Sequence, residues 1–264
     1  MDLNINSAWS AASAILRNFS FYDIKEIVGL AGFDSSRISH LVQRSGSSTS
    51  KGQLITEIEQ GLSEFTDEEK RHFVNIVIEE MLDRNSNIEE QLEKYLSRLG
   101  WQIIDGLVLP IEILDRNDLN ELAEESKADL LKAAKRFRDG DLSGAVSAAC
   151  GAVDSVTQKI YQSNNLGDFG KTSFQERCKV ALHSVGIFSA INSELRDINW
   201  KDAGVVPFSK NFEKALNHAS YIMQSLRANM SDVHGTKQVL RPLVFDSIKW
   251  AQIIIRLLSK QYNT

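Results

Sequence analysis

The chain has 264 residues, of which 42% are apolar and 25% charged, and these are ordinary values for a globular protein. No apolar run approaches the roughly 20 residues that a membrane span needs, and no basic segment followed by an apolar run opens the chain, so we expect neither a membrane protein nor a signal peptide. The two cysteines form no Cys-x-x-Cys pair, which argues against a zinc site or a disulfide framework and favours a reducing, cytoplasmic location.

The net charge of -5 is unevenly distributed along the chain. Residues 1–119 contain 11 basic and 20 acidic side chains, a net charge of -9, whereas residues 120–264 contain 19 and 15, a net charge of +4. A polyanion such as RNA should therefore prefer the second part of the chain. A chance partition of surface charge explains the same asymmetry equally well.

The first 85 residues have apolar side chains mostly at helical spacing. Within them, Thr66 followed by Glu69 has the pattern of a capping box, which marks the start of a helix. We therefore predict an acidic helical N-terminal domain over residues 1–85.

The one convincing β signal is the stretch WQIIDGLVLPIEI at 101–113. Two apolar, β-branched runs flank Asp105-Gly106, a preferred dipeptide for a hairpin turn, and Pro110 restricts the second strand to an edge or to its own end. An isolated hairpin is only marginally stable, so it is expected to pack on helices. Because it lies near the change of charge sign, we treat residues 86–119 as a connector that contains a helix and this hairpin.

From residue 120 to the end the spacing is helical again, so the predicted fold is mainly all-α, with a C-terminal helical bundle over 120–264. Small residues crowd the predicted helix around 145–152 and allow other helices to approach it closely. Pro207 is expected to begin the next-to-last helix, and the last helix is expected over about 240–260. Asp154 lies near the apolar stripe of the small-residue helix, so it is either exposed or in need of a partner.

The stretch RANMSDVHG places Arg227 and His234 seven residues apart between the two last predicted helices. On a continuous helix both would lie on one face, two turns apart. If the helix breaks there, Ser231 or Asp232 can cap the next one, and the histidine then lies in a first turn, where a phosphate is favoured. Arg227 falls at the margin of the buried stripe of its helix, so we expect it to be half shielded.

Such a pair suits phosphodiester cleavage without a metal or another cofactor. A histidine exchanges protons near neutral pH and can take the proton of a ribose 2′-hydroxyl, and an arginine stabilises the charge that builds on the phosphoryl oxygens. One arginine and one histidine on a helix face are also commonly structural, so the residue types alone leave both interpretations open.

The stretch LRANMSDVHG resembles the RX4–6H motif of the HEPN superfamily (higher eukaryotes and prokaryotes nucleotide-binding), with six residues between its arginine and its histidine. More narrowly, residues from about 120 to 260, a little over half of the chain, resemble the C-terminal domain of bacterial abortive infection proteins. This narrower resemblance includes the small-residue helix with Asp154 and Lys159, and the apolar final helix after the His-Gly pair.

The resemblance implies a compact helical bundle, a homodimer and a metal-independent endoribonuclease of phage defence. Arg227 and His234 would be catalytic, with Asp154, Asn229 and Asp232 as supporting residues. In this family a polar residue, often Asn, follows the arginine, but here it is Ala228. Either Asn229 takes that role from a shifted position, or the site is weakened.

Some members of this family bind without cleaving, so a second hypothesis remains. The chain would then be a non-catalytic scaffold that binds a nucleotide or a partner protein through the same groove. In either case residues 1–85 are expected to sense a trigger or to bind a protein partner.

Overall fold

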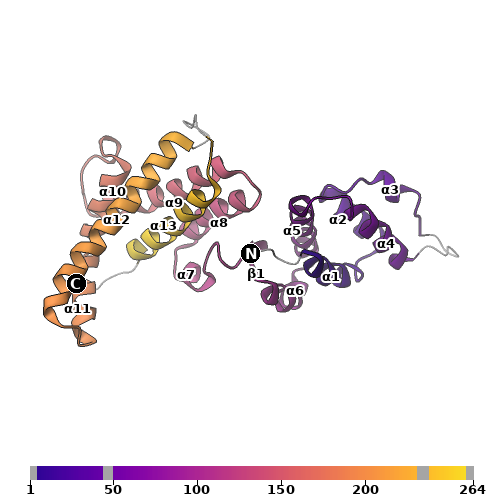
Figure 1. Ribbon diagram of the computed structural model, residues 1–264, viewed down its shortest axis with the longest axis horizontal. Helices are drawn as coiled ribbons and strands as arrows, with labels where there is room; N and C mark the ends of the chain where they lie inside the picture. Colours follow the sequence, from indigo (N-terminus) through magenta and orange to yellow (C-terminus); the bar gives the residue numbers. More distant parts are fainter. Residues whose placement is uncertain (1–4, 44–49, 231–237, 260–264) are drawn as a thin grey trace. The chain divides into compact units, whose positions relative to one another are not determined.

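The computed structural model describes residues 5–43, 50–230 and 238–259 (Figure 1). Over these residues it contains thirteen α-helices and one two-stranded antiparallel hairpin, so the predicted mainly all-α class is confirmed. No helix in these ranges combines the length and the apolar content that a membrane span requires. The chain divides into two compact units, residues 1–112 and residues 113–264.

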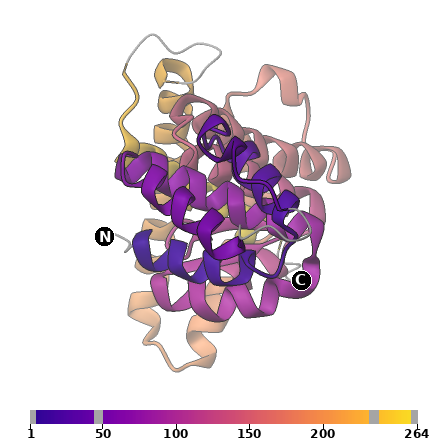
Figure 2. The ribbon, with the colours of Figure 1, turned by 90° about the vertical axis from the view of Figure 1, so that its right-hand side faces the viewer.

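The first unit packs its helices, indigo to purple in Figures 1 and 2, around one apolar core. Three of its helices begin with a reciprocal capping box, including the predicted one at Thr66 and Glu69, so their first backbone N–H groups are satisfied locally. Its elements are α1 (Ile5–Leu16), α2 (Phe21–Leu30), α3 (Ser36–Ser39), α4 (Lys51–Leu62), α5 (Asp67–Arg84), α6 (Glu89–Leu96), the 3₁₀ turns Ser86–Ile88 and Ser97–Leu99, β1 (Trp101–Ile104) and β2 (Leu107–Pro110).

The hairpin forms where the sequence predicts it, with Trp101 paired to Pro110 and Pro110 at the end of its strand. Asp105 and Gly106 both have positive φ, 49° and 76°, as a two-residue turn of this hand requires. Trp101 is fully buried, and the backbone N–H of Val108 donates to Glu79 Oε1 of α5 at 3.1 Å. Residues 86–112, most of the expected connector, therefore lie within the first unit, because the hairpin covers its apolar residues with α5 and α6.

The second unit is organised around α9, which packs against α8, α10, α12 and α13. Ala145, Ala149 and Ala152 are fully buried on α9, and their small side chains let these helices approach closely. The elements are α7 (Arg116–Asn120), α8 (Glu124–Arg138), α9 (Leu142–Ser163), the 3₁₀ turn Phe169–Lys171, α10 (Phe174–Ser184), α11 (Ile187–Asp197), α12 (Asp202–Met230) and α13 (Arg241–Ser259).

The helix start predicted at Pro207 is wrong, because α12 begins five residues earlier at Asp202. Tertiary packing fixes this extra turn. Val205 is fully buried, and the indole of Trp200 lies so close to Gly204 that an added Cβ would be 2.7 Å from Nε1. Pro207 is the sixth residue of α12, so it lacks the N–H that would donate to the Ala203 carbonyl, and the packing of the first turn has to offset that loss.

Candidate functional site at the end of alpha12

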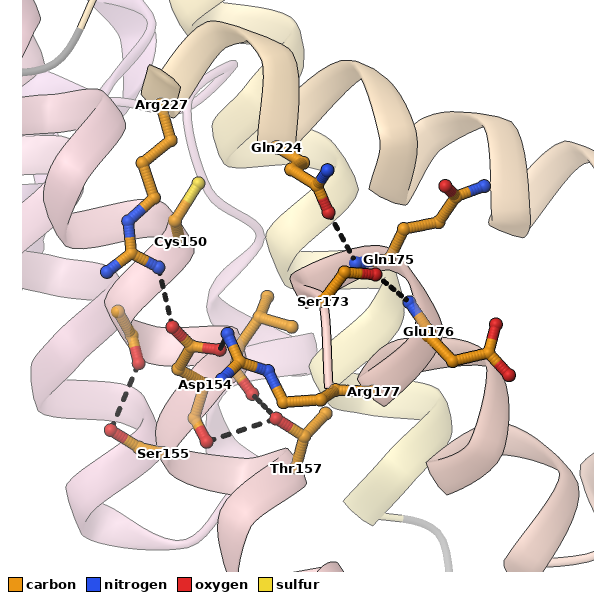
Figure 3. A network of polar contacts seen from close by, with 12 residues as sticks. Cys150, Asp154, Ser155, Thr157, Ser173, Gln175, Glu176, Arg177, Gln224 and Arg227 are labelled. Carbon is orange, nitrogen blue, oxygen red and sulfur yellow. Dashed lines mark hydrogen bonds and ion pairs between the residues drawn. The ribbon is translucent and has the colours of Figure 1, made fainter. Parts of the chain in front are cut away.

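The candidate site lies where the last turn of α12 faces the middle of α9 and the start of α10 (Figure 3). Arg227 comes from α12, Asp154 from α9 and Arg177 from α10. The first two are 73 residues apart in sequence. Their pairing is therefore a consequence of the tertiary fold and brings together two of the residues that the sequence analysis singled out.

The carboxylate of Asp154 lies between two guanidinium groups. Arg227 Nη1 donates to Asp154 Oδ2 at 2.6 Å, and Arg177 Nη2 lies 2.9 Å from Asp154 Oδ1. The second contact is an ion pair without hydrogen-bond geometry, so Oδ1 accepts no hydrogen bond from the described residues. Only 19% of the Asp154 side chain is exposed. Of the two alternatives left by the sequence, the acid with a partner is the one that the structure contains.

Arg177 is the member of this cluster that the sequence analysis missed. Its side chain is only 15% exposed, and its guanidinium carbon lies 4.2 Å from the centre of the Phe169 ring, an arrangement that adds a cation–π attraction. Phe169 in turn contacts Tyr161 edge-on at 5.5 Å. The signal that pointed to a partner was the acid itself, because a carboxylate near an apolar stripe requires an opposite charge.

Arg227 is half shielded, with 39% of its side chain exposed, as its place on the helix predicts. One carboxylate faces two guanidinium groups, so the Asp154, Arg177 and Arg227 cluster keeps a net positive charge. The largely buried Arg177 is committed to the aspartate and an aromatic ring, whereas the side chain of Arg227 remains partly exposed. The arrangement therefore holds a partly exposed cation in a fixed position, which suits the binding of an anion such as a phosphate.

Two buried thiols lie beside this cluster. Burial raises the pKa of Cys150 to about 12 and that of Cys178 to about 12. The thiol of Cys150 donates to the Met223 carbonyl at 3.6 Å, which links α9 to α12. Because the thiolate is the reactive form, the raised pKa disfavours a nucleophilic role for either cysteine at neutral pH, and the burial of both is consistent with packing.

The remaining predicted residues do not join the cluster within the described part of the chain. The side-chain amide of Asn229 donates to the Ser225 carbonyl of its own helix at 2.7 Å, and both Asn229 and Ala228 are exposed. Lys159 pairs with Glu125 of α8. Asp232 and His234 lie outside the described residues. Where the structure describes the chain, it brings together no group of His, Cys, Asp and Glu side chains that could hold a metal ion.

Position 228 faces solvent, because consecutive residues of a helix point about 100° apart and Arg227 points toward α9. A polar side chain at 228 would therefore not reach Asp154 from α12 as it stands. Comparison with known proteins gives no relative: no family model, no curated protein and no solved structure matches this chain.

Proposed function

We propose that this chain is a metal-independent, HEPN-type endoribonuclease of bacterial phage defence that cuts RNA as a homodimer. The observation that carries the proposal is Arg227, whose guanidinium is held at 2.6 Å by the largely buried Asp154, whose side chain stays partly exposed and which precedes His234 by seven residues. The net positive charge of the second part of the chain supports the same substrate class.

In this proposal each residue has a distinct task. His234 takes the proton of the ribose 2′-hydroxyl while the 2′-oxygen attacks the adjacent phosphorus. The bond from phosphorus to the 5′-oxygen of the next nucleotide breaks, and the protonated imidazole gives its proton to that leaving oxygen. Arg227 binds the phosphoryl oxygens as their negative charge increases. Asp154 is a positioning residue, because it fixes the arginine and does not touch the substrate. The products are a 2′,3′-cyclic phosphate and a free 5′-hydroxyl.

The competing function is a non-catalytic module that binds a nucleotide or a partner protein. The Arg227–Asp154 contact favours it, because a close pair with a buried carboxylate is also what a purely structural arginine forms. The exposed Ala228, in place of a polar residue, points the same way.

The test is an RNA cleavage assay with purified protein and chelator, using total tRNA and mixed cellular RNA. Wild type should generate 2′,3′-cyclic phosphate ends, and His234→Ala and Arg227→Ala should lower the rate by about 100-fold or more. His218→Ala is the matched control, because this exposed histidine lies on α12 away from the cluster and its loss should leave the rate unchanged.

Cleavage that survives His234→Ala at the wild-type rate would contradict the proposal. Nucleotide or protein binding that persists in His234→Ala, with no cleavage of any RNA by wild type, would establish the binding module in its place. Light scattering adds a check on assembly, because a strict monomer is incompatible with a site shared between two copies.

A further inference from the structure

A groove of about 240 Å³ lies between α8 and α9, separate from the contacts described above. One wall comes from α8 and contributes charged side chains, and the other comes from α9 and contributes small ones. The lining residues are Asp129, Lys132 and Arg136 on α8, and Ser147, Ala148, Gly151 and Ser155 on α9.

The α8 wall offers both a cation and an anion to a ligand. Lys132 and Asp129 form no ion pair with any described residue. Arg136 is held in place, because its Nη1 donates to the Gly144 carbonyl at 3.1 Å and its Nε lies 3.7 Å from Asp141. The groove therefore combines two cationic groups with one carboxylate that is free to accept a hydrogen bond.

The residues that α9 contributes to the groove have small side chains, and this leaves space for a ligand. No atom lies within 4 Å of the place where a Cβ on Gly151 would be, so this glycine opens the floor of the groove. The Ser155 hydroxyl donates to the Gly151 carbonyl at 3.0 Å, which leaves its oxygen available as an acceptor. A ligand for this groove needs an anionic group for α8 and hydrogen-bond donors for Asp129 and Ser155.

The groove and the candidate site use neighbouring faces of α9. Ser155, on its wall, directly follows Asp154, which holds Arg227, and both are seen on the same stretch of α9 in Figure 3. At about 240 Å³ it is smaller than the roughly 300–1,000 Å³ of pockets that enclose a whole drug-sized ligand. It is therefore suited to part of a longer molecule that also reaches Arg227.

We propose that the α8–α9 groove binds one nucleotide of an RNA strand, next to the phosphate that Arg227 contacts. Lys132 and Arg136 bind its phosphate, and Asp129 and Ser155 accept hydrogen bonds from its hydroxyl or amino groups. The inference rests on the proposed function for the choice of RNA, but it concerns binding and is measured without cleavage.

The test is fluorescence anisotropy with a labelled single-stranded RNA of ten nucleotides in the presence of chelator, using His234→Ala as the background so that the probe stays intact. Lys132→Gln should weaken binding roughly tenfold. It should also reduce the slope of log affinity against log salt concentration by about one, as expected for the loss of one phosphate contact. Lys135→Gln is the matched control, because it removes the same charge from the exposed surface of α8 outside the groove, and it should change affinity by less than about twofold.

A second variant separates the shape of the groove from its charge. Gly151→Leu fills the open floor without changing any charge, and it should weaken RNA binding roughly tenfold. Leucine is a better helix former than glycine, so the variant is expected to fold at least as stably, which circular dichroism and its melting temperature check. Wild-type affinity in both Lys132→Gln and Gly151→Leu would overturn the subsite.

Two further results distinguish this inference from the proposed function. If wild type cleaves no RNA but binds it in a way that depends on Lys132 and Gly151, the subsite is supported and the nuclease is overturned. If wild type cleaves RNA and the Lys132→Gln and Gly151→Leu variants cleave it at the same rate, the nuclease is supported and the subsite is overturned. The free mononucleotide AMP serves as a competitor: tight binding of AMP without any RNA binding would overturn the subsite and identify the groove as a nucleotide pocket.

Discussion

The two units of this chain differ in how deeply they bury charged side chains. In the first unit Phe73 contacts the rings of Trp9, Phe33 and Phe65 within a mainly aliphatic core. Its ion pairs range from the exposed Arg37–Glu64 to the partly buried Arg84–Glu80, whose side chains are 25% and 27% exposed. In the second unit a carboxylate and a guanidinium are largely buried between helices. Because removing charges from water costs free energy, an arrangement of this kind marks the second unit as the place to look for function.

The largest effect expected from a single substitution at neutral pH is that of Asp154→Ala in the second unit. The substitution leaves Arg177 largely buried without a counter-charge, so the free energy of unfolding should fall by about 3 kcal/mol. Calorimetric melting of the variant and of wild type measures the change. A loss below about 1 kcal/mol would show that the cluster is no more important for stability than a surface ion pair.

Alkaline pH should destabilise the second unit through its buried thiols but not the first, because both cysteines of the chain, Cys150 and Cys178, lie in the second unit. Burial raises the pKa of each thiol to about 12, above its value of about 8.5 in an unfolded chain. Below about pH 8.5 the thiols are protonated in both the folded and the unfolded chain, so they do not lower the free energy of unfolding. As the pH rises from there toward 12 the unfolded chain loses these protons first, and the free energy of unfolding falls by about 1.4 kcal/mol per pH unit for each thiol.

Denaturant titrations between pH 7 and pH 11 measure this loss. The double variant Cys150→Ala, Cys178→Ala is the control, since it retains every other titrating group. Its stability should fall less steeply with pH than that of wild type, and equal slopes would show that the buried thiols do not contribute.

The smallest expected effect is that of Arg37→Ala in the first unit. The Arg37–Glu64 contact is short, at 2.6 Å, but the two side chains are 40% and 64% exposed, so water screens their attraction. The loss of stability should be small, because exposed pairs of this kind contribute little. The companion variant Glu64→Ala removes the other partner and should give the same small shift in melting temperature. A loss as large as that of Asp154→Ala would end the distinction between the two units.

The sequence was informative about the fold wherever local chemistry acts alone. Thr66 and Glu69 form their capping box, and Asp105-Gly106 turns the hairpin, because each depends on residues within a few positions of one another. The start of α12 was predicted wrongly at Pro207, because the helix begins five residues earlier and buries Val205, and burial of that side chain depends on the tertiary fold.

For the candidate site the sequence indicated Arg227 from its spacing to His234, and it indicated that Asp154, unless exposed, needs a partner. It could not indicate that the partners of Asp154 are Arg227 and Arg177, which lie 73 and 23 positions further along the chain. Such pairings depend on which helix faces pack together, and only the arrangement of α9, α10 and α12 decides this. The groove between α8 and α9 also depends on the tertiary structure, since its lining residues come together only when the two helices pack side by side.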